Sequence, residues 1–222
     1  MIEIKTLEVC GFQPAIIGMR NPMNSWAKSD SSSELTGYCV GKNDHDLMMK
    51  LRNAGTDHRK FMRMITVYAD ITAPLYWWKE FDTYKVGTVA NSCSTMHKIH
   101  AKEFTIDDFS HEYLINDYKF KSNEEDVNSE WLEALYVVID RLNFARNMYI
   151  KTKDKTYWWQ MIQLLPSSYN QKRTVMLNYE VLANIYKSRK DHKLDEWRSL
   201  CDWIETLPYG ELITGEDNGD TV

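Results

Sequence analysis

The sequence predicts a mixed α/β fold, and three observations support that prediction. The chain has 222 residues, of which 43% are hydrophobic and 27% charged, a balance typical of a globular protein that buries a core. Residues 61–72 are rich in β-branched and aromatic side chains, and residues 171–177 also fit a strand. Residues 131–150 carry apolar side chains at three- and four-residue spacing, as in an amphipathic helix. We expect one domain over residues 1–214 and a flexible acidic tail over 215–222.

Charge and composition exclude several classes of protein. The formal net charge of −5 argues against a nucleic-acid binder, because affinity for phosphate backbones depends on clustered Lys and Arg. No stretch reaches the roughly 18 apolar residues of a membrane span, and the N-terminus lacks the pattern of a signal peptide. We therefore expect a cytoplasmic protein with no membrane partner. The cysteines form no CxxC pair, which favours free thiols and predicts no bound metal: Cys10, Cys39, Cys93 and Cys201.

The first fifty residues are predicted to contain a strand region, a loop and a helix. Residues 2–20 alternate apolar and polar side chains at their start, and we interpret them as a strand or a strand pair. Residues 21–43 are rich in Asn, Pro, Ser and Gly and are typical of a long loop, either functional or mobile. Asn43 or Asp44 can then cap a helix that runs to about Asn53.

The strand at 61–72 leads into a second predicted helix. Pro74 suits the first position of a helix, because its missing N–H is not needed there. The helix is expected over residues 75–85 and is ended by Gly87. Residues 88–95 are expected to be a polar loop.

The second half of the chain is predicted to be mainly helical. Residues 106–127 indicate a helix followed by a loop, and the amphipathic helix follows from Trp131. A short helix over 157–165 ends at Pro166. After the strand at 171–177, Asn178 can cap a helix through Arg189, because its amide satisfies the free N–H groups of the first turn. A last helix is expected over 194–207.

Signatures of common enzyme classes are absent from the sequence, including the glycine-rich phosphate loops and the HExxH and GxSxG motifs. His97 and His100 lie near Cys93 and could share a metal if helical, although solvated or hydrogen-bonded histidines are the commoner case. Three basic clusters could meet an anionic ligand or simply lie in solvent and at helix ends. They are residues 58–63, 172–173 and 187–193.

Two segments carry a distinctive set of residues: Leu165-Pro166, Asn178, Asn184 and Arg189 within 165–197, and Ala73-Pro74 within 55–98. These segments resemble the flavin-dependent thymidylate synthases. In that family a Leu-Pro pair is followed by a strand, then by two Asn residues on a helix, then by an Arg. Residues 165–197 contain these features in the same order and spacing: Leu165-Pro166, Asn178, Asn184 and Arg189. Residues 55–98 contain the Ala-Pro helix start at Ala73-Pro74. They then place Thr83-Tyr84-Lys85 where the family has Arg-His-Arg, and Cys93 or Ser94 where it has a Ser.

The resemblance implies a fold and a reaction. The fold is an antiparallel curved sheet packed with long helices, assembled as a homotetramer. FAD lies at the subunit interfaces with dUMP, or a related pyrimidine nucleotide, stacked on the flavin. NADPH reduces the flavin and methylenetetrahydrofolate supplies a carbon, so that C5 of dUMP is reductively methylated. The flavin carries out the hydride chemistry, and the protein orients and polarises the reacting groups.

The resemblance also implies site residues. The cofactor contacts are Asn178, Asn184, Lys85, Tyr84 and His58. The nucleotide contacts are Arg189, Ser94, Cys93 and Gln163, and the catalytic role falls to Arg189. A guanidinium suits a phosphate or a uracil edge because it presents paired donors. Asn178 can equally be a helix cap alone. For Arg189 the alternative is a charge at a helix end, but the matching spacing favours ligand contact.

The sequence departs from the family at several of these positions. Besides Thr83-Tyr84-Lys85, Glu180 stands where the family has a flavin-contacting Arg, and Ile162 stands where it has a dUMP-binding Arg. These departures leave two alternatives open. One is a lapsed or repurposed oligomer that binds nucleotides or proteins on the same fold. The other is a flavoenzyme that acts on a different nucleotide, because rebuilt polar groups select a different substrate.

Overall fold

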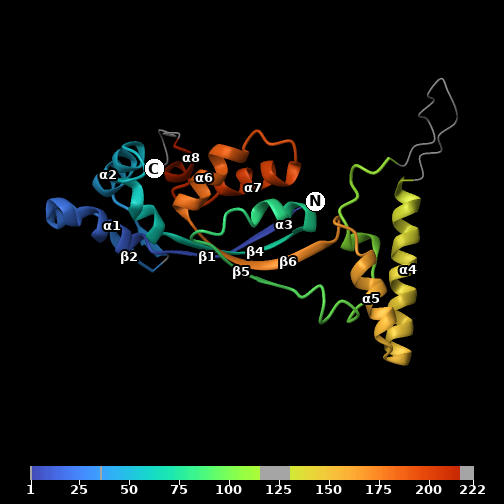
Figure 1. Cartoon of the computed structure of the whole chain (residues 1–222). Coiled ribbons are helices and arrows are strands. Elements are labelled where there is room, and N and C mark those ends of the chain that lie inside the picture. The colour runs from blue at the N-terminus through green and yellow to red at the C-terminus, as the bar shows by residue number, and fades with distance from the viewer. Residues whose placement is uncertain (1, 36, 116–130, 216–222) are drawn as a thin grey trace, which may run out of the picture. The chain divides into compact units, whose positions relative to one another are not determined.

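The computed structural model describes residues 2–35, 37–115 and 131–215 (Figure 1). It divides the chain into two compact units, which are described separately below. Unit 1 comprises Thr72–Glu80 and Ser92–Lys172. Unit 2 comprises Ile2–Ile71, Phe81–Asn91 and the chain from Arg173 onward. Of the expected tail at 215–222, only Gly215 is described, and residues 216–222 lie outside the described part. The expectation of a single domain stays a prediction.

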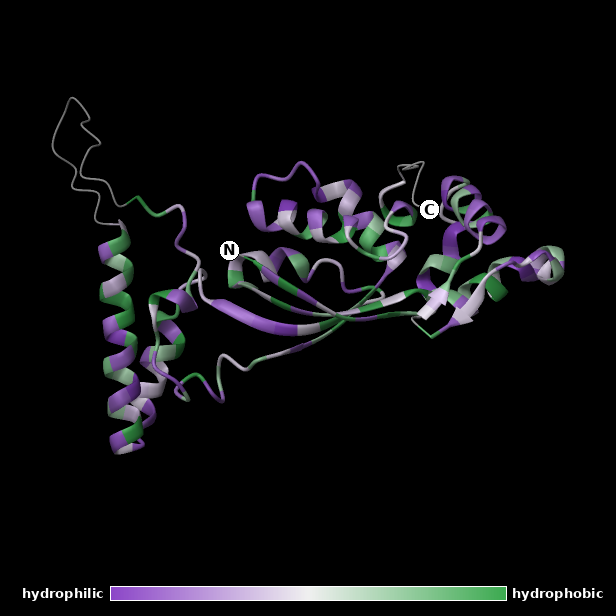
Figure 2. Ribbon diagram, turned by 180° about the vertical axis from the view of Figure 1, so that it is seen from behind, coloured by the Kyte–Doolittle hydropathy of each residue, from purple (hydrophilic) through white to green (hydrophobic). Residues whose placement is uncertain are grey.

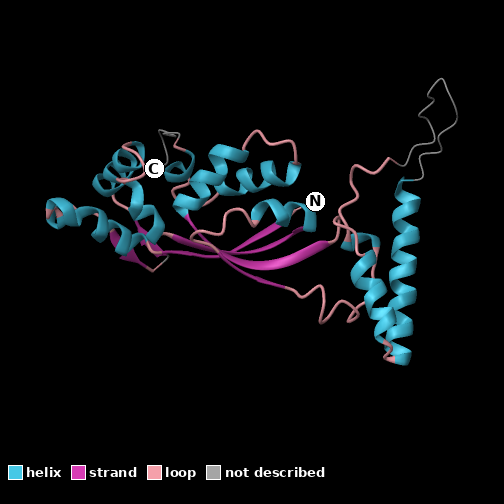
Figure 3. Ribbon diagram, viewed as in Figure 1, coloured by secondary structure: helices cyan, strands magenta, loops and turns pink. Residues whose placement is uncertain are grey.

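The structure contains an antiparallel four-stranded sheet, whose strands are coloured magenta in Figure 3. Its strands lie in the order β1 (Glu3–Cys10), β4 (Thr66–Pro74), β6 (Asn170–Asn178) and β5 (Val89–Ser92). In β4 every second side chain is fully buried: Val67, Ala69, Ile71 and Ala73. This period of two confirms the predicted strand pattern. Pro74 closes β4, and does not open the helix as we expected.

Strand β5 corrects the predicted polar loop at 88–95. Its four side chains are all exposed, so no apolar alternation marks it in the sequence. A strand at the edge of a sheet needs only backbone partners on one side, which polar residues supply as well as apolar ones. The predicted helix over 75–85 is also shorter than expected, because α3 spans only Leu75–Phe81.

The N-terminal segment contains one strand and one helix, which corrects the predicted strand pair. Gly11 adopts a φ of 98°, and a side chain there would collide with the carbonyl of Met64. The chain therefore turns at Gly11 and enters α1 (Phe12–Arg20), whose inward side chains recur at helical spacing: Phe12, Ala15, Ile16 and Met19. The alternation that predicts a strand is confined to residues 2–9.

The segment predicted as a long loop contains short ordered elements. These are η1 (Asn21–Met23), η2 (Trp26–Lys28) and an antiparallel hairpin of β2 (Ser32–Glu34) with β3 (Gly37–Cys39). Helix α2 (Lys42–Asn53) follows, close to its predicted range. Its predicted caps are wrong. Asp30 accepts from the backbone N–H groups of Asn43, at 2.9 Å, and Asp44, at 3.1 Å. The Asp44 side chain turns inward instead.

Unit 2 also contains the C-terminal helices. Helix α6 (Tyr179–Arg189) contacts η3 (Arg59–Met64), α7 (Asp195–Glu205) and α8 (Glu211–Thr214). The predicted helices at 178–189 and 194–207 are confirmed, whereas α8 was not predicted. Buried side chains of α7 recur at three- and four-residue spacing, as expected for a helix that packs on a core: Trp197, Leu200, Cys201 and Ile204.

Unit 1 contains the longest helix among the residues that the structure describes. Helices α4 (Trp131–Thr152) and α5 (Lys155–Leu164) lie side by side, and Figure 2 shows apolar and polar residues alternating along α4. Their core contains Leu135, Ile139, Leu142, Met161 and Phe109. The amphipathic prediction is confirmed. In the segment 106–127, the described residues form η4 (Ile106–Asp108) and an isolated β-bridge from Phe109 to Tyr169, in place of the predicted helix. Residues 116–127 lie outside the described part. No helix of the described part is long and apolar enough to cross a membrane.

Candidate functional site

Asn178 lies at the junction of β6 and α6, and its side chain also hydrogen-bonds the turn at Gly87. Its Oδ1 accepts from the N–H of Val181 at 3.0 Å, the expected cap of α6. Its Nδ2 donates to the carbonyl of Gly87 at 3.3 Å. Gly87 has a φ of 79°, and a Cβ there would lie 2.8 Å from Nδ2. Both polar atoms of the Asn178 amide are therefore used within the chain, which supports the cap interpretation.

Arg189 and Tyr84 meet in the structure. Arg189 Nε donates to the Tyr84 hydroxyl at 3.0 Å, and its Cζ lies 4.5 Å from the ring centroid of Trp197. Trp197 is fully buried, and Arg189 is half-buried. A planar guanidinium stacks on an aromatic face more favourably than an ammonium does. The end of α6 thus holds a cation whose plane is oriented by two aromatic rings.

Two arginines contact Glu180 and Asn184 of α6. Arg63 Nε donates to Glu180 Oε2, and Arg59 Nε lies 3.5 Å from Glu180 Oε1. Arg59 also donates from Nη2 to Asn184 Oδ1 at 3.0 Å. The hydrogen bond and the charge of Glu180 raise the pKa of Arg63. Both arginines come from η3, directly after His58, which is exposed.

Lys85 lines a small polar pocket of about 280 Å³. Arg173 and Asp82 also line it, and Arg173 Nη1 donates to Asp82 Oδ1 at 2.9 Å. Thr88 completes the polar lining and donates its hydroxyl to the carbonyl of Tyr84 at 2.7 Å. Two cations and one carboxylate leave a net positive charge in this pocket, which suits an anionic group.

The other predicted site residues belong to unit 1. The Ser94 hydroxyl accepts from the N–H groups of Met96, at 3.2 Å, and His97, at 2.9 Å, and so stabilises a turn. Cys93 and Gln163 are exposed. His97 and His100 do not share a helix, which removes the basis of a common metal site. Within the residues that the structure describes, no three His, Cys, Asp or Glu side chains could hold a metal ion.

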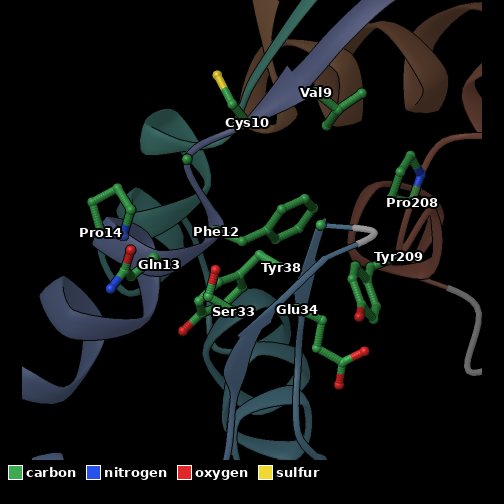
Figure 4. A pocket seen from close by; sticks show the side chains of 12 residues that line it. Val9, Cys10, Phe12, Gln13, Pro14, Ser33, Glu34, Tyr38, Pro208 and Tyr209 are labelled. Carbon is green, nitrogen blue, oxygen red and sulfur yellow. The ribbon is translucent and has the colours of Figure 1, made fainter.

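A larger pocket of about 700 Å³ lies in unit 2, and none of the predicted site residues is among the described residues that line it. Figure 4 shows aromatic side chains from separate segments around it, including Phe12, Tyr38 and Tyr209. The rings of Phe12 and Tyr209 meet edge to face with centroids 5.2 Å apart. Their packing fastens α1 to the segment before α8.

Comparisons with known proteins give matches in structure but not in sequence. No protein-family model matches the chain, and no characterised sequence matches it. Thymidylate synthase X from Helicobacter pylori, crystallised with FAD and dUMP, aligns over 97% of this chain and 98% of its own, with a TM-score of 0.66 and 15% identity. A second structure of the Helicobacter pylori enzyme with FAD and dUMP gives a TM-score of 0.67 at 15% identity, covering 96% and 98% of the two chains.

The chain has the fold of a flavin-dependent thymidylate synthase. The UMP/dUMP methylase PolB from Streptomyces cacaoi, bound with 5-Br dUMP, also shares it, with a TM-score of 0.57 and 12% identity over 93% of this chain and 89% of that one. The similarity extends over nearly the whole chain, so the predicted fold class is confirmed.

Sequence reasoning missed three of the cations that the structure brings to α6 and to the polar pocket: Arg59, Arg63 and Arg173. Their signal was present, because they belong to the basic clusters, for which composition favours solvation and leaves an anionic ligand as the alternative. Only the pairing with Glu180 and Asp82 separates them from ordinary surface charges. The flavin and nucleotide roles of the residues named from the resemblance stay predictions.

Proposed function

We propose that the chain is a flavin-dependent thymidylate synthase-like enzyme. It would reductively methylate C5 of dUMP or a related pyrimidine nucleotide with FAD, NADPH and methylenetetrahydrofolate. The observation that carries the proposal is the shared fold over 97% of the chain with an enzyme crystallised with FAD and dUMP. The position of Asn178 at the N-cap of α6, and of Asn184 and Arg189 within that helix, supports it.

Arg189 is the proposed nucleotide ligand of unit 2. Its guanidinium is held by the Tyr84 hydroxyl and the Trp197 ring, so little side-chain freedom is lost when a phosphate or a uracil edge binds. Its proposed catalytic role is to orient the nucleotide. Cys93, Ser94 and Gln163 are the proposed nucleotide contacts of unit 1.

FAD fits the chemistry of two groups of residues in unit 2. The polar pocket with Lys85 and Arg173 offers two cations for a phosphate. The buried Nε of Arg59 has no hydrogen-bond partner in the described part of the chain, and it lies beside Asn184. Lys85, Arg59, Asn184, Tyr84, His58 and Asn178 are the proposed cofactor residues. When bound, FAD supplies hydride transfer, and these residues hold and orient it.

A homotetramer is part of the proposal, and α4 supports it. Val137 and Phe144 are more than half exposed, on the side of α4 away from the buried Leu135, Ile139 and Leu142. A helix with a second apolar face usually packs against another chain. Trp159 of α5 adds another large exposed side chain.

The first test is the absorption spectrum of the purified protein, recorded before and after FAD is added and the excess removed. A retained flavin band is the expected result. NADPH oxidation and methylation are then measured with dUMP and with UMP. Protein that retains no FAD and methylates neither nucleotide contradicts the proposal.

A second candidate is a nucleotide-binding oligomer that has lost the flavin. The observation that favours it is the pairing of Arg59 and Arg63 with Glu180, which neutralises one of the cations that a cofactor phosphate would use. This candidate predicts binding of dUMP without a flavin band. Detectable methylation of dUMP eliminates it.

A further inference from the structure

The contacts of Glu180 define an arginine–glutamate cluster, which comprises Arg59, Arg63, Glu180 and Asn184. Glu180 is 6% exposed and lies in the first turn of α6, where the helix dipole favours a negative charge. Arg63 bonds both carboxylate oxygens, through Nε and through Nη2 at 3.4 Å. One buried carboxylate thus faces two guanidiniums.

The cluster carries more positive than negative charge. Two arginines and one glutamate give the cluster a net charge of +1, and Asp57 adds one nearby negative charge that also acts on Arg63. Arg52 adds one positive charge that acts on Arg59, and burial and the charge of Arg59 lower the pKa of Arg52. The Nε of Arg59 is buried and lies 3.5 Å from Glu180 Oε1, but it makes no hydrogen bond with the described residues. A buried donor without a hydrogen bond costs free energy, so the cluster favours an additional anion.

The cluster is also accessible. The Arg63 side chain is 60% exposed, and Asn184 is exposed on the same helix face, about one turn after Glu180 in α6. Arg59 lies beneath them with its side chain 18% exposed. An incoming group would therefore meet the Asn184 amide and the outer N–H groups of Arg63 first, and Arg59 behind them.

We propose that Arg59, Arg63 and Asn184 receive a phosphate group of a ligand, and that Glu180 is the residue that limits their affinity for it. Guanidiniums bind phosphate with paired, charge-assisted hydrogen bonds, and the Asn184 amide adds a donor. Glu180 competes for the same donors and repels the incoming anion. The chain thus keeps the two arginines ordered without a ligand and reduces non-specific binding of anions.

This inference deepens the proposed function, because Asn184 belongs both to the arginine–glutamate cluster and to the proposed cofactor site. The identification of the phosphate as part of a flavin nucleotide rests on the proposed function. The arginine–glutamate cluster itself does not depend on the reaction. A phosphate probe without a flavin or a pyrimidine therefore tests the cluster alone.

The experiment titrates inorganic pyrophosphate into the purified full-length protein by calorimetry at low salt. Glu180→Gln keeps the shape of the side chain and removes its charge, so we expect it to bind pyrophosphate at least about tenfold more tightly than the parent protein. Arg63→Gln should bind it at least about tenfold more weakly than the parent, and circular dichroism with a melting curve shows that each variant is folded. The matched control is Asp46→Asn, because Asp46 pairs with exposed Lys42 outside the cluster and gives the same change of net charge.

Three results would overturn the inference. They are a Glu180→Gln affinity within about twofold of the parent, an equal gain in Asp46→Asn, and unchanged binding in Arg63→Gln. FAD titration and dUMP methylation are measured on the same samples. A tenfold gain for pyrophosphate, with no flavin band and no methylation of dUMP or UMP, supports the phosphate site and contradicts the proposed enzyme. A flavin band with no gain for pyrophosphate supports the enzyme and contradicts the phosphate site.

Discussion

Arg189 shows at the residue scale how a surface charge becomes a positioned group. Lysine at this position would keep the charge but lose the planar contact with Trp197 and the directed bond to Tyr84. The aromatic contacts are therefore specific to arginine. The role proposed for Arg189 requires this orientation, and the helix-end interpretation does not.

Arg189→Lys should bind dUMP about tenfold or more weakly, while the free energy of unfolding falls by less than about 1 kcal/mol. Calorimetric titration with dUMP and urea denaturation measure the two effects. The control is Arg198→Lys, an exposed arginine that pairs with Asp195 on α7. Equal dUMP affinity in Arg189→Lys and the parent would leave Arg189 as a structural charge.

Asp44 is the most fully satisfied buried charge among the described residues. It is completely buried and accepts from Arg20 Nε at 2.5 Å and from the hydroxyls of Ser29 and Ser31, each at 2.6 Å. These bonds tie α1 and the segment before the β2–β3 hairpin to α2. Asp44→Asn would leave Arg20 buried without its counter-ion, so we expect a loss of about 3–5 kcal/mol in the free energy of unfolding.

The same residue predicts a pH dependence. Burial acts to raise the pKa of Asp44, but hydrogen bonds from Ser29, Ser31 and Arg20 outweigh it and lower the pKa below the ordinary value of 3.8. The carboxylate therefore stabilises the fold fully above about pH 4, and this contribution is lost as the pH falls through the lower, folded-state pKa. Urea denaturation between about pH 3 and 7 should show this loss in the parent and in Asp46→Asn. If the free energy of unfolding of Asp44→Asn falls equally at low pH, groups other than Asp44 cause the loss.

At the scale of elements, the Gly87 turn and the start of α6 depend on each other. Asn178 caps α6 and holds the Gly87 carbonyl, and the turn carries Lys85 and Thr88 of the polar pocket. A change at Gly87 therefore affects the helix cap as well as the pocket. Neither the helix signal nor the glycine signal in the sequence predicts this connection.

Gly87→Ala should lower the free energy of unfolding by about 1–3 kcal/mol, because its Cβ both requires a strained φ and crowds Asn178. Gly55→Ala is the matched control, since Gly55 has a φ of 108° but no atom lies within 4 Å of the point that its Cβ would occupy. The difference between the two variants in chemical denaturation measures the contact with Asn178. A Gly87→Ala loss no larger than that of Gly55→Ala would contradict a close contact.

At the scale of the whole molecule, the exposed apolar side chains of α4 relate to assembly. A single chain that keeps Val137 and Phe144 in water forgoes the burial of two large side chains. In the proposed homotetramer these side chains would be covered by another subunit. The assembly state is thus testable separately from the chemistry.

Phe144→Glu should shift the protein to a smaller oligomer, because a charge replaces an apolar contact at an interface. Light scattering coupled to size-exclusion chromatography measures the mass. The control is Asn147→Glu, an exposed position on the polar part of α4. An unchanged mass in Phe144→Glu would show that this side chain lies outside the interface.

The sequence by itself determined the elements whose signals are local. The apolar period of α4, the alternation in β4 and the Asn178 cap all depend on residues within a few positions of one another, and each is present in the structure. The resemblance identified Arg189, Tyr84 and Asn184, and the structure brings Arg189 and Tyr84 into contact.

Only the tertiary structure decided the pairings between distant segments. Strand β5 shows no apolar pattern in the sequence, because its four side chains are exposed and backbone pairing holds it in the sheet. The Asp44 side chain accepts from Arg20 and does not cap α2, whose first N–H groups donate to Asp30. Arg63 finds Glu180 across 117 positions of sequence. Such contacts depend on which surfaces the packed core brings together, and no spacing within the chain records that choice.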